Sequence, residues 1–516
     1  MNAPFLQYMV FGDVSFLDYY SEREEEKLFS FTETFLSFLH FTMEETRVYK
    51  QMTREWMMLS TSFLSYYQGI QHYAKSYIDY FQSLYFYLIE DGNEESVTKR
   101  ETEWTLLNPL KFPTAEEEIV DMRGKRKILV LTWEFPPHIV GGLSRHVYGL
   151  TKSLSKMGYE IHVITARQEQ LPVYERSEGV FVHRVNPLNE NEKDFLIWIG
   201  GLNIALSEKA ETLAHTYQFD CIHAHDWLVG AAASVLKNRL AIPLVTTIHA
   251  TEFGRNNGIY TEMQSFIHEK ERKLVEQSDQ IIVCSDYMKQ EIQQLFNPPI
   301  EKVITIPNGI DSESEIVVGQ EGVLNGIPID PSRKMIFSIG RIVKEKGFDT
   351  LIETAAILKK KGSNIYFLIA GKGPMLDEYR RKVDELQLTD TVFFIGFVDD
   401  NQRNKLFEHC DITVFPSLYE PFGIVALESM KANKPTIVSN TGGLKGIVQH
   451  LKTGLLMIPG STDSLIEQIM RLLNDPNLAK QVGENGKRIV ESLFSWNRVA
   501  EETKRVFEEV KINGKL

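Results

Sequence analysis

The chain has 516 residues, of which 43% are hydrophobic, so it is long enough for two or three domains with ordinary buried cores. Its formal net charge of −14 argues against a nucleic-acid partner, because phosphate contacts need a basic face, and it offers no general attraction to anionic membranes. The cysteines Cys221, Cys284 and Cys410 are too few and too scattered for a disulfide framework or a zinc knuckle, which indicates a reducing compartment.

The beginning of the sequence shows no signal peptide, because it lacks basic residues and because Asp13 and Asp18 interrupt its apolar residues. The longest uncharged aromatic runs, such as 80–89, are far shorter than the roughly 20 residues needed to span a bilayer. We therefore expect a cytoplasmic protein without a transmembrane span.

Residues 1–90 carry 23 of the 56 aromatic residues and read as a separate helical segment. Capping-box patterns predict helices that begin near residues 22 and 43, and apolar residues recur every three or four positions from Tyr66 to Leu88. This stripe is either core or a surface for docking of a partner, including a second copy of the chain, for membrane contact or for stacking on a glycan. Residues 91–124 read as an acidic linker.

From Lys127 onward, short apolar strands alternate with helical stretches, a pattern typical of parallel, doubly wound sheets. The alternation forms two series, which predicts an α/β protein with two Rossmann-like domains, 125–308 and 309–495, facing a cleft and followed by a segment at 496–516. The expected strands are 128–132, 161–165, 221–224, 244–248 and 280–284 in the first domain, and 335–339, 365–370, 392–395, 412–415 and 436–439 in the second.

Two carboxylates, Glu420 and Glu428, bracket the passage from an apolar strand to a helix. Glu420 would lie beyond the carboxyl end of the strand, where open α/β sheets bind ligands, and Glu428 would lie more than a turn inside the helix. The amides of Phe422, Gly423 and Ile424 at the helix N-terminus suit hydroxyl or phosphate oxygens. On spacing alone, an ordinary loop with solvated glutamates explains the pattern equally well.

Basic residues and glycines follow the first strand of each series. Arg341 and Lys346 offer a planar fork and a point charge that suit phosphate groups, although solvated loop cations are the simpler interpretation of either one alone. Gly141 and Gly142 precede a helix opened by Ser144, so their amides can approach a phosphate closely, but a plain turn has the same pattern.

Histidines follow two strands of the first series. His223, His225 and Asp226 have the chemistry of metal ligands, but no third cluster lies at ligand spacing in the sequence, so no metal is predicted. His249 follows the next strand, where a structural histidine that caps the strand is the alternative to a site residue. Asn308 reads as a turn former.

These motifs together resemble those of the retaining family 4 glycosyltransferases of the GT-B fold. The likeness is greatest to glycogen and starch synthases, through 223–227 and 247–255, and it extends over about residues 126–510. The stretches that carry the resemblance are Val140-Gly-Gly-Leu143, Thr247-Ile-His249-Ala, Pro307-Asn-Gly-Ile-Asp311, Arg341-Ile-Val-Lys-Glu-Lys346-Gly347 and Glu420-x7-Glu428.

The resemblance implies a reaction that separates an anionic diphosphate from an oxocarbenium-like sugar, so the leaving group must be neutralised. The sequence has no Asp-x-Asp motif to hold a divalent metal, and we therefore expect no cofactor and assign diphosphate binding to Arg341 and Lys346. Synthases of this family carry a lysine just before the two glycines that match Gly141 and Gly142, whereas this sequence has His138-Ile-Val there. The role of that lysine therefore has no counterpart in this sequence.

The resemblance also implies roles for the other residues. Asp226 and His249 would line the pocket of the donor sugar, and Glu420 would hold the sugar hydroxyls with the amides of Gly423 and Ile424 beside it. Glu428 would accept the ribose hydroxyls. Phe397 matches an aromatic residue that stacks on the nucleobase, with core packing as the alternative. In this family the last helix crosses back to the first domain, as 496–516 would here.

The function that the resemblance implies is transfer of a glucosyl unit from ADP- or UDP-glucose to an α-glucan. Alternatives with the same fold are transfer to a lipid, small-molecule or surface-polysaccharide acceptor, and epimerisation of a nucleotide sugar. A glycan-binding scaffold without activity is disfavoured because Arg341, Lys346, Glu420 and Glu428 are all present. An oxidoreductase is disfavoured because no Gly-x-Gly-x-x-Gly follows a strand.

Overall fold

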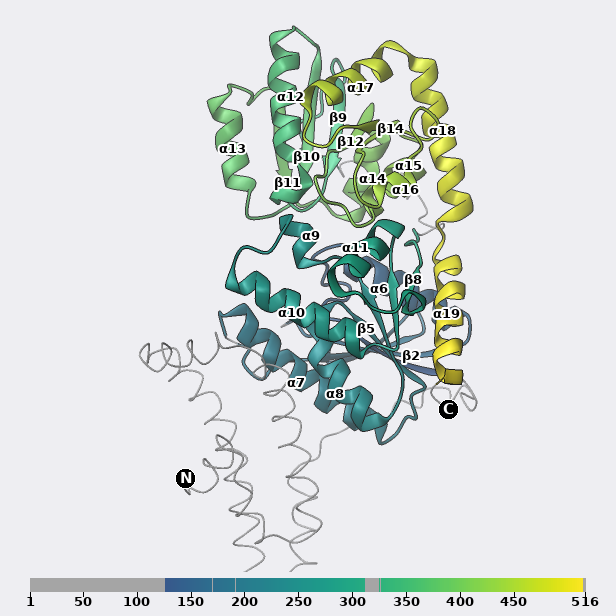
Figure 1. Ribbon diagram of the computed structural model, residues 1–516. Coiled ribbons are helices and arrows are strands. Elements are labelled where there is room, and N and C mark those ends of the chain that lie inside the picture. The colour runs from purple at the N-terminus through teal and green to yellow at the C-terminus, as the bar shows by residue number, and fades with distance from the viewer. Residues whose placement is uncertain (1–125, 169, 191, 311–323, 325, 514–516) are drawn as a thin grey trace, which may run out of the picture. The chain divides into compact units, whose positions relative to one another are not determined.

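The computed structural model describes residues 126–513, apart from 169, 191, 311–323 and 325 (Figure 1). The described residues belong to one compact unit, Lys125–Leu516. The predictions for 1–90 and 91–124 lie outside these residues. Among the helices of the described residues, none is long and apolar enough to cross a membrane.

The first half of the described chain forms an eight-stranded sheet in the order β3-β4-β2-β1-β5-β6-β7-β8. All neighbouring strands are parallel except β3 and β4, which form an antiparallel pair at one edge. The strands are β1 (Lys127–Leu131), β2 (Glu160–Ala166), β3 (Tyr174–Ser177), β4 (Val180–Val185), β5 (Cys221–His225), β6 (Leu244–Ile248), β7 (Gln280–Val283) and β8 (Val303–Thr305).

The second half forms a six-stranded, fully parallel sheet in the order β11-β10-β9-β12-β13-β14. In both halves the first strand lies inside the sheet with later strands on either side of it, as in doubly wound folds. The strands are β9 (Lys334–Ile339), β10 (Ile365–Ala370), β11 (Val392–Gly396), β12 (Ile412–Phe415), β13 (Thr436–Ser439) and β14 (Leu455–Met457).

Helices connect the parallel strands in both halves (Figure 1). Those of the first half are α6 (Gly142–Lys156), α7 (Phe195–Ala214), α8 (Gly230–Leu240), α9 (Glu252–Asn256), α10 (Glu262–Gln277) and α11 (Asp286–Phe296). Those of the second half are α12 (Phe348–Lys360), α13 (Leu376–Glu385), α14 (Asp400–His409), α15 (Ile424–Lys431), α16 (Leu444–Ile447), α17 (Thr462–Asn474), α18 (Pro476–Leu493) and α19 (Trp496–Asn513).

Both faces of the first sheet are covered, as the continuous apolar strands require. Side chains alternate along β1, so Leu129 and Leu131 belong to one apolar cluster, while Ile128 and Val130 belong to another. The first of these clusters also contains Phe337 of β9, so one apolar core is shared by the two halves.

The C-terminal helix α19 packs against α6 of the first half, the arrangement that the family resemblance implies. The contact is close because α6 carries a glycine at the crossing: a Cβ atom at Gly149 would lie 2.1 Å from Trp496 Cε2. Just before α19, the amide of Ile310 donates to the carbonyl of Phe494 over 2.9 Å, which joins the segment between the two sheets to the end of α18.

Each strand that the sequence predicts is present, with ends that differ by at most one residue. The sequence interpretation missed β3, β4, β8 and β14. Three of these are only three or four residues long, and β3 has exposed and half-buried residues only, so they lack the apolar run by which the other strands were found.

Candidate active site

The predicted site residues follow strands of both sheets at their carboxyl ends, the edge at which open α/β sheets bind ligands. Asp226 and His249 come directly after β5 and β6 of the first sheet. Arg341, Phe397 and Glu420 follow β9, β11 and β12 of the second. The fold therefore brings together residues that are nearly 200 positions apart in the sequence.

Glu420 is paired with the predicted phosphate-binding lysine. Lys346 Nζ lies 2.6 Å from Glu420 Oε2, and the Ser417 hydroxyl donates to the same oxygen over 3.0 Å. The backbone here is closely packed, since the Gly443 amide donates to the Glu420 carbonyl and a Cβ atom at Gly442 would lie 2.0 Å from that carbonyl oxygen. The Glu420 loop is thus fixed by backbone contacts as well as by the ion pair.

Gly423 and Ile424 form the start of α15, as predicted from their spacing. Gly423 caps the helix with φ at 112°, a conformation that favours glycine, and a Cβ atom there would lie 2.5 Å from Leu444 Cδ2. Ile424 Cδ1 would lie 3.5 Å from a Cβ atom at Gly142, the first residue of α6. The N-termini of α6 and α15, one from each half, therefore meet.

Glu428 lies inside α15, where it contacts two arginines that the sequence interpretation did not assign to the site. Arg145 of α6 places its Nη1 3.6 Å from Glu428 Oε1, and Arg403 of α14 places its Nη1 3.4 Å from the same oxygen. Asp400 completes the network, at 2.7 Å from Arg145 and 2.9 Å from Arg403. Arg145 thus links the first half to the predicted ribose-binding carboxylate.

Arg341 lies among positively and negatively charged side chains. Its Nη2 atom is 3.4 Å from Glu345 Oε1, and the side chain is 42% exposed. Burial and the positive charge of Arg255 lower the pKa of Arg341, while Glu345, Glu420 and Glu134 act against this shift. Arg255 therefore adds a further positive charge to the site, although the sequence interpretation used it only for the family resemblance.

Gly141 and Gly142 cap and open α6, so this helix begins two residues before Ser144. The buried Glu134 accepts hydrogen bonds from the amides of Val140 at 2.5 Å and Ser144 at 3.1 Å. Two amides of this turn therefore already have a carboxylate acceptor within the chain, which no pattern in the sequence indicated. Burial raises the pKa of Glu134, and the amide hydrogen bonds oppose that rise.

Asp226 and His249 are joined by a hydrogen bond, in which the His249 amide donates to Asp226 Oδ1 over 2.7 Å. Asp226 is buried and has φ at 61°, a strained conformation for a residue other than glycine. Burial raises the pKa of Asp226 to about 6, although Arg255 and the amides of His249 and Ala250 favour the carboxylate. Burial, with Arg255 second, lowers the pKa of His249 to about 3.

Three more histidines surround His249. The ring centroids of His146 and His249 are 4.7 Å apart, and His225 Nδ1 lies 3.1 Å from His249 Nε2. His223 makes its contact with the Thr247 hydroxyl over 2.8 Å. Burial, with the neighbouring His249, lowers the pKa of His146 to about 3, and burial likewise lowers the pKa values of His223 and His225. The histidine cluster is therefore uncharged at neutral pH.

His146 adds a third imidazole to His225 and His249, and spacing in the sequence did not reveal it. It lies on α6, far from His225 and His249 in the chain, and only the fold places it beside them. Asn308, interpreted as a turn former, is instead buried with its Oδ1 atom 2.8 Å from His146 Nδ1. The spacing argument against a metal therefore does not hold in three dimensions.

Phe397 is 62% exposed, so core packing does not explain it. Lys372 Nζ lies 5.6 Å from the centroid of its ring. An exposed ring at the carboxyl end of a parallel strand is available for stacking on a flat ligand.

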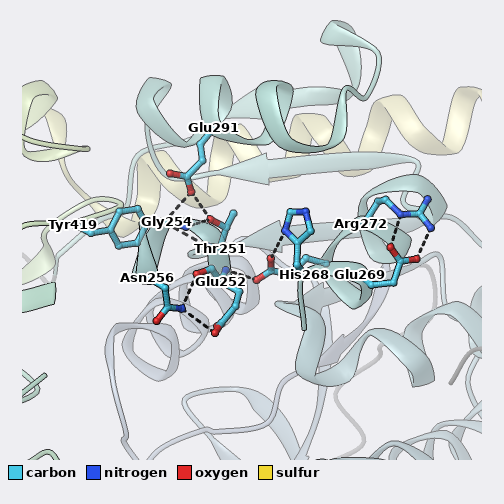
Figure 2. A network of polar contacts seen from close by, with 10 residues as sticks. Thr251, Glu252, Gly254, Asn256, His268, Glu269, Arg272, Glu291 and Tyr419 are labelled. Carbon is cyan, nitrogen blue, oxygen red and sulfur yellow. Dashed lines mark hydrogen bonds and ion pairs between the residues drawn. The ribbon is translucent and has the colours of Figure 1, made fainter. Parts of the chain in front are cut away.

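A polar network connects the loops that carry His249 and Glu420 (Figure 2). The Tyr419 hydroxyl donates to Glu291 Oε1 over 2.9 Å, and the Thr251 hydroxyl donates to the same oxygen over 2.6 Å. The Thr251 amide donates to the Tyr419 hydroxyl over 3.3 Å. Glu291 of α11 thus fixes a loop of the second half against a loop of the first.

The same network supports α9, which carries Arg255. The buried Glu271 accepts from the Glu252 amide at the start of this helix over 2.8 Å, and His268 Nδ1 lies 3.9 Å from its second oxygen. Burial raises the pKa of Glu271 to about 8, although the amide hydrogen bond and Arg255 favour the charged form.

Family models match both halves of this architecture. Residues 140–314 match the model described as Glycosyltransferase Family 4, and residues 324–489 match the model described as Glycosyl transferases group 1. The chain is 36% identical over 386 residues to an uncharacterized glycosyltransferase of Methanocaldococcus jannaschii, an alignment that covers 74% of this chain and 98% of the relative. The protein is thus a glycosyltransferase.

A second relative defines its place more closely. The chain is 30% identical over 399 residues to the glycogen synthase of Mycobacterium tuberculosis, with 74% of this chain and 94% of the relative covered. Its fold matches HepE of Anabaena in complex with UDP and glucose, with a TM-score of 0.59, 20% identity, and 74% and 100% of the two chains covered. The chain belongs to family 4 of the glycosyltransferases with the GT-B fold, near the glycogen synthases.

Proposed function

We propose that this glycosyltransferase moves a glucosyl unit from ADP- or UDP-glucose to an α-glucan, with retention of the anomeric configuration. The observation that carries the proposal is the pairing of Lys346 with Glu420 at 2.6 Å, which puts a cation for the leaving group beside a carboxylate for the sugar hydroxyls. The similarity to a glycogen synthase over nearly the whole length of that relative supports the α-glucan acceptor.

Neutralisation of the leaving diphosphate is assigned to Arg341 and Lys346. As the bond between sugar and phosphate breaks, negative charge accumulates on the diphosphate, and fixed cations that face this charge lower the barrier. The guanidinium of Arg341 offers a fork for two phosphate oxygens, while Lys346 provides a point charge. We therefore propose that transfer needs no divalent metal.

The remaining residues are assigned to the two ends of the donor. Glu420, with the amides of Gly423 and Ile424, would hold the sugar, and Glu428 would accept the ribose hydroxyls. Phe397 would stack on the base. From the first half, Asp226 and His249 would contact the sugar, and Gly141 and Gly142 would lie near the phosphates.

A cytoplasmic location fits the three cysteines, all of which are free and buried. Since reducing conditions keep such thiols free, we propose a cytoplasmic location.

Incubation with a panel of radiolabelled nucleotide sugars, with and without glycogen, tests the proposal. We expect label from ADP- or UDP-glucose in the polymer, dependent on added glycogen. Label in a lipid or an oligosaccharide would show that the acceptor is not an α-glucan, and it would leave the proposed donor site unchanged. Conversion of the nucleotide sugar to its epimer without transfer would overturn the proposal.

A further inference from the structure

Three imidazole rings from different parts of the chain converge beside the candidate active site. His146, His225 and His249 each offer one nitrogen, and these atoms all lie within 4.8 Å of one another. They come from α6, from the end of β5 and from the residue after β6. Among the residues that the structure describes, these three form the one group of histidine, cysteine, aspartate or glutamate side chains that are close enough together to hold a metal ion.

The hydrogen bonds of His146 leave one of its nitrogens free to bind an ion. Its Nδ1 atom lies 2.8 Å from Asn308 Oδ1, and because an amide oxygen can only accept, the ring proton is on Nδ1. His146 Nε2 therefore carries a lone pair, and it is buried without a hydrogen-bond partner among the residues that the structure describes. A histidine that donates its other nitrogen to an oxygen acceptor is the usual arrangement of a metal ligand.

His225 and His249 already have the separation that a shared ion requires. Zn²⁺ bound at about 2.1 Å in tetrahedral geometry separates its ligand nitrogens by about 3.4 Å. His225 Nδ1 and His249 Nε2 are 3.1 Å apart, so one of these two nitrogens carries a proton and donates a hydrogen bond to the other. Binding of an ion to both would move that proton to the outer nitrogen of the same ring. The third ring would need to approach by about 1–1.5 Å to complete this geometry.

We propose that His146, His225 and His249 bind a divalent transition-metal ion, with Zn²⁺ as the physiological candidate. Neutral imidazoles are ligands for zinc, copper, nickel and cobalt and not for magnesium or calcium, so the site selects this class of ion. The carboxylate of Asp226, which accepts the His249 amide over 2.7 Å and directly follows the ligand His225 in the chain, provides a counter-charge. The fourth position of a tetrahedral ion is left to water.

Such an ion is distinct from a cofactor of the transfer reaction. It would occupy the imidazole of His249, which the proposed function places beside the donor sugar, and would therefore inhibit transfer. This consequence rests on the proposed function, whereas binding of the ion does not. Binding is measured without a nucleotide sugar, so failure of either proposal can be recognised separately.

The test is a titration of the chelator-stripped, full-length protein with Co²⁺, which reports tetrahedral imidazole ligation by strong visible absorption bands. We expect saturation at one ion per chain and loss of the bands when Zn²⁺ is added. Replacement of the orienting group by Asn308→Ala should weaken binding about 10–100-fold, and His146→Gln should weaken it further. The matched control is His162→Gln, another buried histidine, whose partners are His183 and Glu160.

Absence of saturable binding in the unmodified protein would overturn the proposal. So would binding that survives His146→Gln, or that is lost equally in His162→Gln, since the ion would then belong elsewhere. His146→Gln could fail to fold, which circular dichroism would reveal. In that case, X-ray absorption at the zinc edge of the unmodified protein with bound Zn²⁺ identifies the type of ligand. Three imidazole ligands support the site, and a shell of oxygen or sulfur ligands contradicts it.

Discussion

Lys346 Nζ and Glu420 Oε2 lie 2.6 Å apart, with only 20% and 10% of the two side chains exposed. The pair joins the loop after β9 to the loop after β12, neighbouring strands of the second sheet. In a donor complex the same lysine would be shared between this carboxylate and the diphosphate. Under the proposed function, the carboxylate would hold the cation in place before the substrate arrives, which is the preorganisation that electrostatic catalysis requires.

Arg341→Ala and Lys346→Ala should each lower turnover by about two orders of magnitude or more, equivalent to about 2.7 kcal/mol of transition-state stabilisation. The reason is that each removes a positive charge that the proposed function places beside the leaving diphosphate. The matched control is Lys344→Ala, an exposed lysine in the same loop, which should keep nearly full turnover. Steady-state kinetics and a thermal melt of each variant provide the measurement. Equal losses in Lys344→Ala and Lys346→Ala would mean that general charge, not position, matters.

Glu428→Gln should weaken binding of the free nucleoside diphosphate about tenfold, because a ribose diol donates to a carboxylate better than to an amide. Glu420→Gln should instead lower kcat, with a smaller effect on nucleotide affinity. Calorimetric titration of both variants with UDP and ADP separates the two roles. If both variants lose affinity to the same extent, the division of roles between the carboxylates is wrong.

The buried carboxylate of Asp226 should destabilise the folded protein at neutral pH. Its pKa is raised from 3.8 to about 6 in the folded state, so the folded state binds the proton more tightly than the unfolded state. Stability therefore falls as pH rises between these values, and the full penalty, on the order of 3 kcal/mol, persists above pH of about 6. Asp226→Asn removes the charge and keeps an oxygen that can accept the His249 amide.

We expect Asp226→Asn to melt at a higher temperature than the unmodified protein at neutral pH, and to lose this advantage near pH of about 4, while its activity is reduced throughout. Thermal melts of both proteins across this pH range are the measurement. A difference in melting temperature that does not change with pH would show that Asp226 is not a buried, destabilising carboxylate.

Tyr419→Phe should loosen the contact between the loops of His249 and Glu420. It removes one hydrogen bond to the Glu291 carboxylate, worth about 1.5–3 kcal/mol, while the Thr251 hydroxyl continues to donate to the same oxygen (Figure 2).

Denaturant unfolding and KM for the nucleotide sugar provide the readouts for Tyr419→Phe. The control is Tyr260→Phe, since the Tyr260 hydroxyl donates to the Asn257 carbonyl within the first half. Both variants lose one hydroxyl, but only Tyr419→Phe should raise KM. An unchanged KM would mean that this network stabilises the fold without positioning the site.

The fold could be predicted because it rests on local patterns, and so could the position of the candidate site residues at the ends of strands. The strands are apolar runs, and residues such as Arg341 and Glu420 follow them at the edge where parallel sheets bind ligands. Short strands such as β8 and the exposed β3 have no such pattern, so they were not predicted.

The contacts that pair distant residues could not be predicted. Arg145 meets Glu428 from a helix of the other half, and His146 meets Asn308 from 162 positions away. Glu134 accepts amides that belong to the following turn, and a lone buried acid has no recognisable spacing. Such contacts depend on how the two sheets are packed, which no local periodicity encodes.

The proposed transfer is metal-independent and retaining, and nuclear magnetic resonance of the first product of the reaction tests both properties at once. The reaction contains nucleotide α-glucose, a short α-glucan acceptor and an excess of chelator. We expect undiminished turnover, with a new α-linkage and one nucleoside diphosphate released for each unit transferred. A β-linked first product would contradict retention, and activity that is abolished by the chelator and restored by magnesium would contradict metal independence.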